Sequence, residues 1–295
     1  MLNKTPLRYP GGKTLMANLF IDMFEVNHLE HITYAEPYAG GAGTAISLLL
    51  DNKVERIIIN DANVGIYSFW NAIINEKEKF IDLIQTIPVN LKEWNNQHSF
   101  FINNHIPSFE LGFSTFYLSR TNRSGILNAG PIGGSTELKQ DSAKYKIDCR
   151  FNRDDLVDKI TCIANRKNDI IVRNKDAIQF LKDLKGKDKF IYLDPPYYVN
   201  GKSLYMDYYK KQDHAKLAEY LKDTTKFKWV LSYDNVSEIR DLYNGYDLYE
   251  FNLKYTANVV KSGAELLTYS KDLLLPDSHV IRRKERNVEL KKILV

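Results

Sequence analysis

The sequence has 295 residues, of which 44% are hydrophobic and 26% charged, as is ordinary for a globular protein with a sizeable core. No apolar run approaches the roughly 18 residues of a transmembrane helix, and the first residues lack the apolar stretch of a signal peptide. Cys149 and Cys162 show no spacing typical of a zinc site or a disulfide scaffold, so we expect no metal. These features predict a cytoplasmic protein without membrane contact.

The net charge of +4 is unevenly distributed along the chain. Residues 120–175 contain 12 Lys/Arg against 7 Asp/Glu, and the rest is close to neutral. A basic segment in a near-neutral protein indicates a polyanionic partner such as nucleic acid. The alternative is a solvated surface with a chance excess of charge, and on charge alone both interpretations stay open.

The first predicted elements alternate between strand and helix. Residues 32–37 read as a buried strand, followed by the glycine turn Tyr38-Ala39-Gly40-Gly41-Ala42-Gly43 and a helix at 44–50. Residues 56–61 form a β-branched run that ends in an acid, and a helical pattern follows at 66–74. This order predicts the start of a doubly wound α/β sheet that binds a nucleoside ligand.

The alternation stops at about residue 76. From there to 165 the chain is polar and aromatic, and we predict an inserted, mainly helical domain over 76–165. Within it, the glycines and proline of residues 121–134 predict a long loop that can approach a ligand closely. Such loops in compact domains are usually functional or disordered.

Sheet-like patterns return after residue 165. We therefore predict a discontinuous catalytic domain, 1–75 and 166–276, built on a mostly parallel sheet. The final segment, 277–295, is a basic tail that is either a packed helix or loose. The strands expected in the second part lie at residues 169–173, 190–193 and 229–233, with a terminal pair at 246–255 and 265–270.

Two features of the first half favour a nucleoside ligand. The glycine turn lets the backbone come close to a ligand, although it lacks the Gly-x-Gly-x-x-Gly spacing of dinucleotide enzymes. Asp61 ends the second strand, where an acid can accept both ribose hydroxyls of a nucleoside. The alternative for Asp61 is a helix N-cap.

The tetrapeptide Asp194-Pro195-Pro196-Tyr197 ends a buried apolar strand. Two prolines cannot donate to a sheet ladder, so the strand must stop there in a stiff turn. A carboxylate, backbone carbonyls and an aromatic face remain, which together offer hydrogen-bond acceptors and a stacking surface. The matching ligand is a planar group with an amine, such as a nucleobase; the alternative is a plain turn with a surface tyrosine.

These residues carry a family resemblance. Leu193-Asp194-Pro195-Pro196-Tyr197, Arg8-Tyr9-Pro10-Gly11-Gly12-Lys13 and Glu36-Pro37-Tyr38-Ala39-Gly40-Gly41-Ala42-Gly43 resemble the alpha group of DNA adenine-N6 methyltransferases, the Dam type. Arg120-Thr121-Asn122-Arg123-Ser124-Gly125 and Leu231-Ser232-Tyr233-Asp234-Asn235 are similar to further motifs of that family. The resemblance covers nearly the whole chain and implies a Rossmann-like methyltransferase fold with an inserted DNA-recognition domain.

The resemblance also implies a cofactor, S-adenosylmethionine, and a site for it. Lys13 would lie near the cofactor's carboxylate, Asp61 at its ribose and Asp176 at its adenine ring. One departure is that Tyr9-Pro10 stands where Dam-type enzymes often have Trp-Ala, but an aromatic residue is kept. The implied cofactor-binding residues are Tyr9, Lys13, Glu36, Pro37, Ala39, Gly40, Asp61, Asp176 and Asp194.

The implied catalytic residues are Asp194, Pro195, Pro196 and Tyr197. Asp194 and the Pro195 carbonyl would accept hydrogen bonds from the target amine, and Tyr197 would stack on the base. Acceptors on both N–H bonds favour a pyramidal nitrogen whose lone pair can attack a methyl group. This geometry cannot be reached inside a duplex, so the base must flip out at a cost of a few kcal/mol.

The expected partner is double-stranded DNA, and we expect the protein to bind it as a monomer. Arg120, Asn122, Arg123 and Ser124 are the candidate DNA-binding residues, because Arg can grip phosphate or guanine and Asn can read adenine. The alternative is a loop held by its own hydrogen bonds. A restriction endonuclease that acts separately is a candidate second partner, and no spacing rule predicts the recognition sequence.

Other functions remain as alternatives. A nicotinamide oxidoreductase would need a longer glycine fingerprint and a hydride-transfer site. A methyltransferase acting on RNA or on cytosine N4 is nearer, although a tetrapeptide that begins with Asp rather than Ser favours adenine. A DNA-binding regulator without catalysis is the third alternative, against which the intact Lys13, Asp61 and Asp194 argue.

Overall fold

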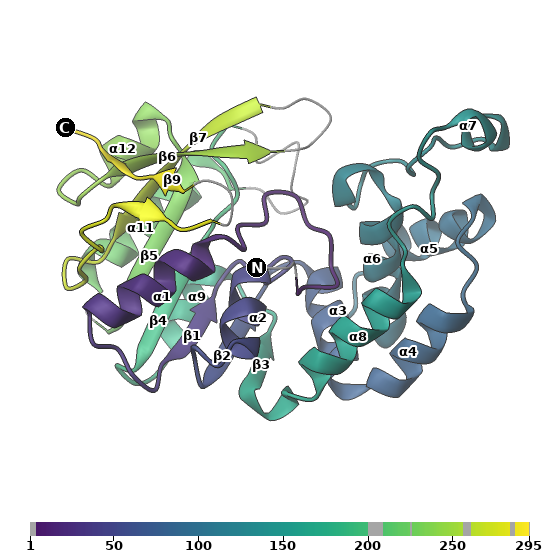
Figure 1. Ribbon diagram of the computed structural model, residues 1–295, viewed down its shortest axis with the longest axis horizontal. Helices are drawn as coiled ribbons and strands as arrows, with labels where there is room; N and C mark the ends of the chain where they lie inside the picture. Colours follow the sequence, from purple (N-terminus) through teal and green to yellow (C-terminus); the bar gives the residue numbers. More distant parts are fainter. Residues whose placement is uncertain (1–3, 200–208, 225, 256–260, 284–286, 295) are drawn as a thin grey trace.

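The computed structural model describes residues 4–199, 209–224, 226–255, 261–283 and 287–294 (Figure 1). Its centre is an eight-stranded sheet with the strand order β10-β6-β7-β5-β4-β1-β2-β3. The strands in chain order are β1 (Thr33–Glu36), β2 (Arg56–Asn60), β3 (Ile170–Arg173), β4 (Lys189–Leu193), β5 (Lys228–Asp234), β6 (Tyr249–Tyr255), β7 (Lys261–Tyr269) and β10 (Lys291–Lys292).

The sheet is mostly parallel, as the sequence predicts. Strands β3, β2, β1, β4 and β5 run in one direction, whereas β7, β6 and β10 pair antiparallel. Ala35 in β1 lies between Ile58 of β2 and Ile191 of β4. The chain order of the strands reverses between β1 and β4, and ligands of such sheets bind at the carboxyl ends of the strands at this reversal.

Helices cover both faces of the sheet because strand side chains alternate between the faces. Tyr34 and Ile57 pack with one set of helices, and Ala35 and Ile58 pack with the other. The fold is therefore doubly wound. The first set is α1 (Met16–Val26), α2 (Gly43–Leu50) and α3 (Val64–Asn75); the second is α9 (Ala177–Asp183), α11 (Lys211–Asp223) and α12 (Ser237–Leu242).

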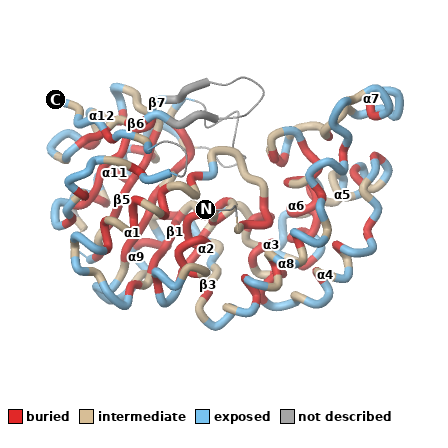
Figure 2. Tube along the Cα trace, in the orientation of Figure 1, coloured by how far each residue is buried: buried red, intermediate tan, exposed pale blue. Residues whose placement is uncertain are grey.

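Residues 76–165 form a group of helices beside the sheet (Figure 1). Its hydrophobic core is continuous with the core on the α1–α3 face, and buried segments run through both parts in Figure 2. The boundaries of the insert stay a prediction. Its elements are α4 (Lys77–Thr86), α5 (Leu91–Asn103), α6 (Phe109–Thr121), η1 (Arg123–Gly125), α7 (Glu137–Ser142) and α8 (Arg153–Ala164).

The insert is joined to the sheet part through a close contact between α3 and α6. A Cβ added to Gly112 of α6 would lie 2.4 Å from the carbonyl oxygen of Ser68 in α3. A Cβ on Gly65 of α3 would lie 2.5 Å from the Thr115 hydroxyl of α6. Both glycines are therefore required by space, and they let the two helices pack backbone to backbone.

The C-terminal segment differs from both of its predicted forms. It is extended, with β8 (Val280–Ile281) pairing β9 (Val288–Glu289) and β10 pairing β6 at the sheet edge. Ile281 and Leu290 are buried in the main core. The helix alternative is thus wrong, since the β-branched residues Val280, Ile281 and Val288 favour strands although the charged composition permits a helix. The helices α1 and α11 were also not predicted from the sequence.

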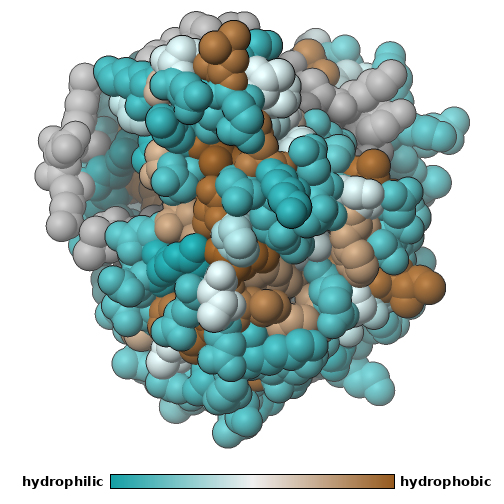
Figure 3. Space-filling model, turned by 90° about the vertical axis from the view of Figure 1, so that its right-hand side faces the viewer, coloured by the Kyte–Doolittle hydropathy of each residue, from teal (hydrophilic) through white to brown (hydrophobic). Residues whose placement is uncertain are grey.

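Figure 3 views the molecule from the side of the insert. That face is mostly hydrophilic, with hydrophobic residues gathered in a band through its middle. Ile106 and Leu138 of the insert are 79% and 81% exposed. Among the described residues, no helix is long and apolar enough to cross a membrane, and no group of His, Cys, Asp and Glu could hold a metal ion.

Candidate functional site

Four chain segments meet at the carboxyl ends of β1 and β4: the N-terminal loop, the tetrapeptide after β4, and the strands β5 and β7. The N-terminal loop brings Lys13 there, and the tetrapeptide brings Asp194. The Lys13 side chain, only 1% exposed, forms an ion pair with Oδ1 of Asp194, whose side chain is 20% exposed. The sequence-predicted residues Lys13 and Asp194 are therefore in direct contact, 181 positions apart in the chain.

A second carboxylate, Glu265 of β7, completes this cluster of charges. Its Oε2 lies 3.4 Å from Lys13 Nζ, and its Oε1 accepts a hydrogen bond of 2.7 Å from the Tyr197 hydroxyl. The Lys13 ammonium also lies 4.9 Å from the centroid of the Tyr197 ring. Sequence reasoning missed Glu265, although a lone acid in the apolar run Ala264-Glu265-Leu266-Leu267 was a usable signal.

Strand β5 holds the tetrapeptide from the other side. The Ser232 hydroxyl donates to Oδ1 of Asp194 at 3.1 Å and lies 2.7 Å from the Tyr192 hydroxyl. The Asp234 carboxylate accepts hydrogen bonds from the backbone N–H groups of Tyr198 and Val199, at 2.9 and 3.0 Å. Polar residues of β5 thus fix both the carboxylate of the tetrapeptide and the chain that leaves it.

Burial raises the pKa of Asp194, and the charge of Glu265 raises it further, whereas the Lys13 ammonium and the Ser232 hydroxyl lower it. The carboxylate is therefore a strong acceptor held close to its charged donor. Pro195, Pro196 and Tyr197 are buried beside it, and the Asp194 side chain is the partly exposed member of the tetrapeptide. Such an arrangement can accept hydrogen bonds from an amine.

The glycine turn is fixed by three contacts. The Gly40 N–H donates to Oδ2 of Asp61 at 2.8 Å, and Trp70 Nε1 donates to the Gly40 carbonyl at 3.0 Å. Gly40 has a φ of +46°, and a Cβ there would lie 2.7 Å from the Tyr9 ring. Only glycine permits this close approach. Tyr9, Gly40 and Asp61, predicted separately, therefore lie together; Ala39 opens the same turn.

Glu36 is buried at the end of β1. Its Oε1 accepts hydrogen bonds from the Tyr34 hydroxyl at 2.9 Å and from the Ala45 N–H at 3.0 Å. Burial raises the pKa of Glu36 to about 8. The carbonyl of the next residue, Pro37, accepts from the Asn60 side chain at 2.9 Å, which links β1 to the end of β2.

The two acids after β2 and β3 are arranged differently. Asp61 Oδ1 accepts from the backbone N–H of Asn63 at 2.9 Å, and the N-cap of α3 is Asn63 itself. The helix N-cap alternative for Asp61 is thus wrong. Asp176 is exposed and caps α9 through the N–H groups of Ile178 and Gln179. A capping role does not prevent Asp176 from facing a ligand at the same edge.

The four predicted DNA-binding residues have different environments. Asn122 is 0% exposed, and its amide binds Trp94 Nε1 at 2.7 Å and the carbonyls of Ile126 and Leu127 at 3.0 and 2.9 Å. This geometry favours the alternative of a loop held by its own hydrogen bonds, and it opposes direct base reading by Asn122. Arg123 is exposed, and Ser124 is half-buried with a left-handed φ of 57°.

Arg120 belongs to a group of arginines that are far apart in the chain and were not predicted to lie together. Its guanidinium donates to the carbonyls of Arg150 and Pro6, and burial together with the charge of Arg8 lowers its pKa to about 10. Burial and the charge of Arg150 lower the pKa of Arg8 as well. Arg8, Arg120 and Arg150 form no ion pair with any carboxylate in the described part of the chain. We call these three residues the arginine cluster.

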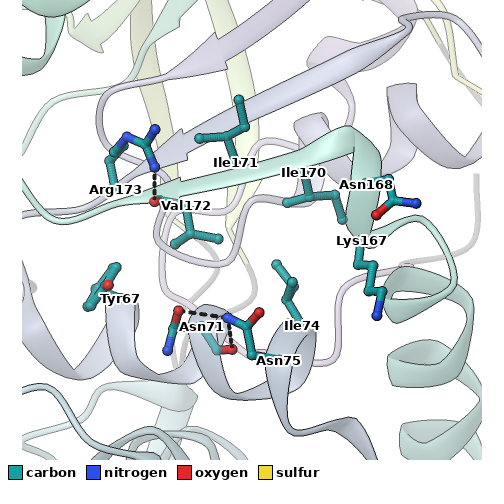
Figure 4. Close-up of a pocket in the computed structure, with 10 residues that line it drawn as sticks. All are labelled: Tyr67, Asn71, Ile74, Asn75, Lys167, Asn168, Ile170, Ile171, Val172 and Arg173. Atoms are coloured by element: carbon teal, nitrogen blue, oxygen red, sulfur yellow. Dashed lines mark hydrogen bonds between the residues drawn. The ribbon is translucent and has the colours of Figure 1, made fainter.

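A hollow of about 500 Å³ lies elsewhere, between α3 and the edge strand β3 (Figure 4). Figure 4 shows Tyr67 and Asn71 of α3 opposite Val172 and Arg173 of β3. No carboxylate lines this hollow, and neither Asp61 nor Asp194 reaches it. It lacks the acceptor chemistry found at the carboxyl ends of β1 and β4, and we give it no role.

The fold and the site together define an α/β protein in which a glycine turn held by Asp61 lies at the same sheet edge as the Asp194 carboxylate and the Tyr197 ring. The family model of the D12 class N6 adenine-specific DNA methyltransferases matches residues 9–257. The chain belongs to this family and is an adenine-specific DNA methyltransferase. The resemblance deduced from the tetrapeptide and the Gly-Gly-Lys segment is confirmed.

Individual relatives agree with the family. The chain is 26% identical over 257 residues to the type II methyltransferase M.CviBI of Paramecium bursaria Chlorella virus NC1A, covering 85% of this chain and 91% of the relative. It is 23% identical to the type II methyltransferase M.MjaIII of Methanocaldococcus jannaschii, covering 82% and 88%. It is 25% identical to the modification methylase StsI of Streptococcus sanguinis, covering 80% of this chain and only 36% of that protein.

Among solved structures, the chain is similar to the rRNA methyltransferase aviRa from Streptomyces viridochromogenes. The TM-score is 0.35 at 11% identity, and the alignment covers 90% of this chain and 87% of the other. A score this low carries no argument about substrate. The α/β assignment of this protein accordingly stands on its own sheet order and helix layers.

Proposed function

We propose that this DNA methyltransferase transfers a methyl group from S-adenosylmethionine to the N6 amine of an adenine flipped out of double-stranded DNA. The observation that carries the proposal is the Asp194 carboxylate at the reversal of the sheet, with the Tyr197 ring and the Lys13 ammonium beside it. An acceptor, an aromatic face and a nucleoside-type turn are then within one site.

The residues at the sheet reversal fit the cofactor. Asp61 places its carboxylate at the glycine turn, where Oδ2 accepts from the Gly40 N–H and Oδ1 from the Asn63 N–H. A carboxylate at this place is the group type that accepts ribose hydroxyls. The Tyr9 ring covers Gly40 and would border the methionine part, with Glu36, Pro37 and Ala39 behind the turn. Asp176 would face the adenine ring. When bound, S-adenosylmethionine supplies an electrophilic methyl group.

The chain's own contribution to the reaction is to orient the target nitrogen. Asp194 accepts a hydrogen bond from one N–H of the amine, and the Pro195 carbonyl accepts from the other. Tyr197 stacks on the flipped base, and its hydroxyl is tied to Glu265, which restrains the ring. Pro196 stiffens the turn between the two groups. Preorganised groups of this kind act where charge develops and need little rearrangement.

The positively charged arginines are the reason to propose a contact with the DNA backbone. Arg8, Arg120 and Arg150 carry positive charge without a described carboxylate partner, and Arg123 is exposed on the loop beside them. Phosphates would neutralise these charges. We propose Arg120 and Arg123, with Ser124, as DNA-binding residues, and Asn122 as the residue that holds their loop.

The names of the relatives suggest a biological setting. Two are type II methyltransferases and one is a modification methylase. We propose that this chain also modifies DNA at a defined site, in a restriction–modification system with a separate endonuclease or as a solitary enzyme. A monomer that acts in the cytoplasm fits this setting.

One experiment tests the cofactor, the base and the site together. The purified chain is incubated with S-adenosylmethionine carrying a labelled methyl group and with double-stranded DNA or, in a parallel reaction, with RNA, and modified positions are then located by sequencing. We expect label at N6 of adenine within one short sequence. Label on cytosine N4, label on RNA alone, or binding of DNA without transfer would each replace the proposal with one of the alternatives.

A further inference from the structure

Glu265 is a carboxylate in the middle of the sheet. It is 1% exposed, and its neighbours in β7, Leu266 and Leu267, are equally buried. A buried carboxylate that served only the fold would be costly, because an apolar residue of similar size would fill the same space without desolvation of a charge. The presence of a charge there calls for a function.

Both oxygens of Glu265 are directed at the catalytic site. Oε1 accepts from the Tyr197 hydroxyl at 2.7 Å, and Oε2 lies 3.4 Å from the Lys13 ammonium. Lys13 in turn pairs with Asp194. Glu265 therefore contacts the stacking residue directly and the acceptor residue through one lysine.

Lys13 and the target amine have the same chemistry toward Asp194, since both present N–H donors to its carboxylate. When the amine arrives, the Lys13 ammonium must share Asp194 or rely on another acceptor. Glu265 is that acceptor, and it is already within ion-pair distance. A lysine held between two carboxylates can yield to the amine without losing its counter-charge.

We propose that Glu265 is a positioning residue for methyl transfer: it holds the Lys13 ammonium and the Tyr197 ring at once, and so sets the charge and the orientation of the acceptor Asp194. This rests on the proposed role of Asp194 as acceptor of the target amine. Glu265 itself need not touch substrate or cofactor.

The pKa of Asp194 depends on its contacts with Lys13 and on the charge of Glu265. Charged Glu265 disfavours the ionised form of Asp194, and Lys13 favours it. Replacing Glu265 by Gln removes one repulsion and leaves the Lys13 ammonium to Asp194 alone, so both effects lower the pKa of Asp194. The other titratable groups that act on Asp194 or feel its charge are Tyr34 and Glu36 of β1, Tyr192 of β4 and Tyr233 of β5.

The test is the pH profile of methyl transfer by Glu265→Gln. Gln keeps an oxygen for the Tyr197 hydroxyl and lacks the charge. We expect kcat to fall, and the acid limb of kcat/KM to move down by roughly one pH unit, because nearby charges shift carboxylate pKa values by about this amount or more. A lower kcat with an unmoved acid limb would reduce Glu265 to a packing role and overturn the proposal.

Two further variants test the proposal without relying on the stability of Glu265→Gln. Tyr197→Phe removes only the hydroxyl that binds Glu265, so kcat should fall while the acid limb stays; an acid limb moved as far as in Glu265→Gln would overturn the assignment of the shift to charge. Glu250→Gln is the matched control on the neighbouring strand β6, where Glu250 binds Asn235, and it should behave as wild type. A Glu250→Gln profile moved like that of Glu265→Gln would also count against the proposal.

The wild-type arm separates this inference from the proposed function. Wild-type protein that transfers no methyl group to adenine in DNA contradicts the proposed function itself. Wild-type activity with an unchanged profile in Glu265→Gln contradicts only the role of Glu265.

Discussion

The site at the sheet and the helical insert treat charge in opposite ways. At the carboxyl ends of β1 and β4, Lys13 has two carboxylate partners and is almost completely buried. In the insert and the N-terminal loop, the arginine cluster has no described carboxylate partner, and Arg123 lies exposed beside it. In the first region the cation is paired with carboxylates, and in the second the described arginines form no ion pair.

This difference matches two ligands. A neutral nucleobase needs fixed donors and acceptors whose charged groups already have partners, because a charge without a partner would be desolvated at a cost when the base enters. A DNA backbone needs the reverse, since it brings its own negative charge and releases counterions on contact. Mutations at the sheet should therefore impair methyl transfer and leave DNA binding intact, and mutations at the exposed arginines should do the reverse.

The largest effect is expected at Asp194. Asp194→Ala removes the acceptor for the target amine, so methyl transfer should fall by roughly 10²-fold or more, while DNA affinity stays near that of wild type. Transfer of labelled methyl groups and DNA binding are measured on the same preparation. Wild-type turnover by this variant would end the assignment of Asp194 as acceptor.

The reverse pattern is expected for Arg123→Ala. DNA affinity should weaken on the order of 10-fold, as for the loss of a hydrogen bond to a charged group. The slope of log affinity against log salt should shrink by about 0.9 for each lost phosphate contact. Turnover at saturating DNA should be little changed. An unaltered salt slope would make Arg123 a structural residue, and Lys139→Ala on α7 serves as a control for general charge.

The joint between the two regions can be tested at Gly112. In Gly112→Ala the new methyl group meets the Ser68 carbonyl, where a Cβ would lie at 2.4 Å. Backbone must shift, and we expect a loss of about 1–3 kcal/mol in the free energy of unfolding, typical of overpacking. Urea denaturation measures it, with Gly245→Ala as a contrast, because no atom lies within 4 Å of a Cβ there and only its φ of +94° opposes alanine. Equal stability of Gly112→Ala and wild type would contradict the helix contact.

The last prediction concerns the pH dependence of stability at Glu36. Burial raises its pKa to about 8 from an ordinary value of 4.5, so the folded protein holds a proton that the unfolded chain releases. Stability from this group is therefore full below about pH 4.5 and is lost as the pH rises toward 8. Glu36→Gln keeps the oxygen for Tyr34 and Ala45 and cannot titrate. Its stability relative to wild type should increase over this pH range in chemical denaturation, and a constant difference would contradict the raised pKa.

Much of the sheet was predictable because its signals are local. The strands β1, β2, β4 and β5 are short β-branched or aromatic runs bounded by turn residues, and a continuous apolar run of this length is typical of a buried strand. The short strands β8, β9 and β10 were not predictable in this way. Their few apolar residues, such as Ile281, take their conformation from pairing with distant segments and from burial against the core.

The same division holds for the site. Asp194 and Lys13 stand in compact motifs, so their chemistry could be deduced from neighbours in sequence. The position of Glu265 was marked by its apolar neighbours, but its partners Lys13 and Tyr197 were not, and the arginine cluster had no local signal, because these contacts join residues far apart in the chain. Asn122 shows the converse: its position in a predicted DNA loop suggested base reading, but packing under Trp94 gave its amide to the protein itself.

The buried amide of Asn122 separates the shape of the loop from its surface. Its three hydrogen bonds stand inside the fold, so an exposed residue of the loop such as Asn128 can change without loss of the frame. A rigid frame also lowers the ordering entropy that binding would otherwise cost. The backbone of the loop can therefore stay constant while its exposed side chains vary.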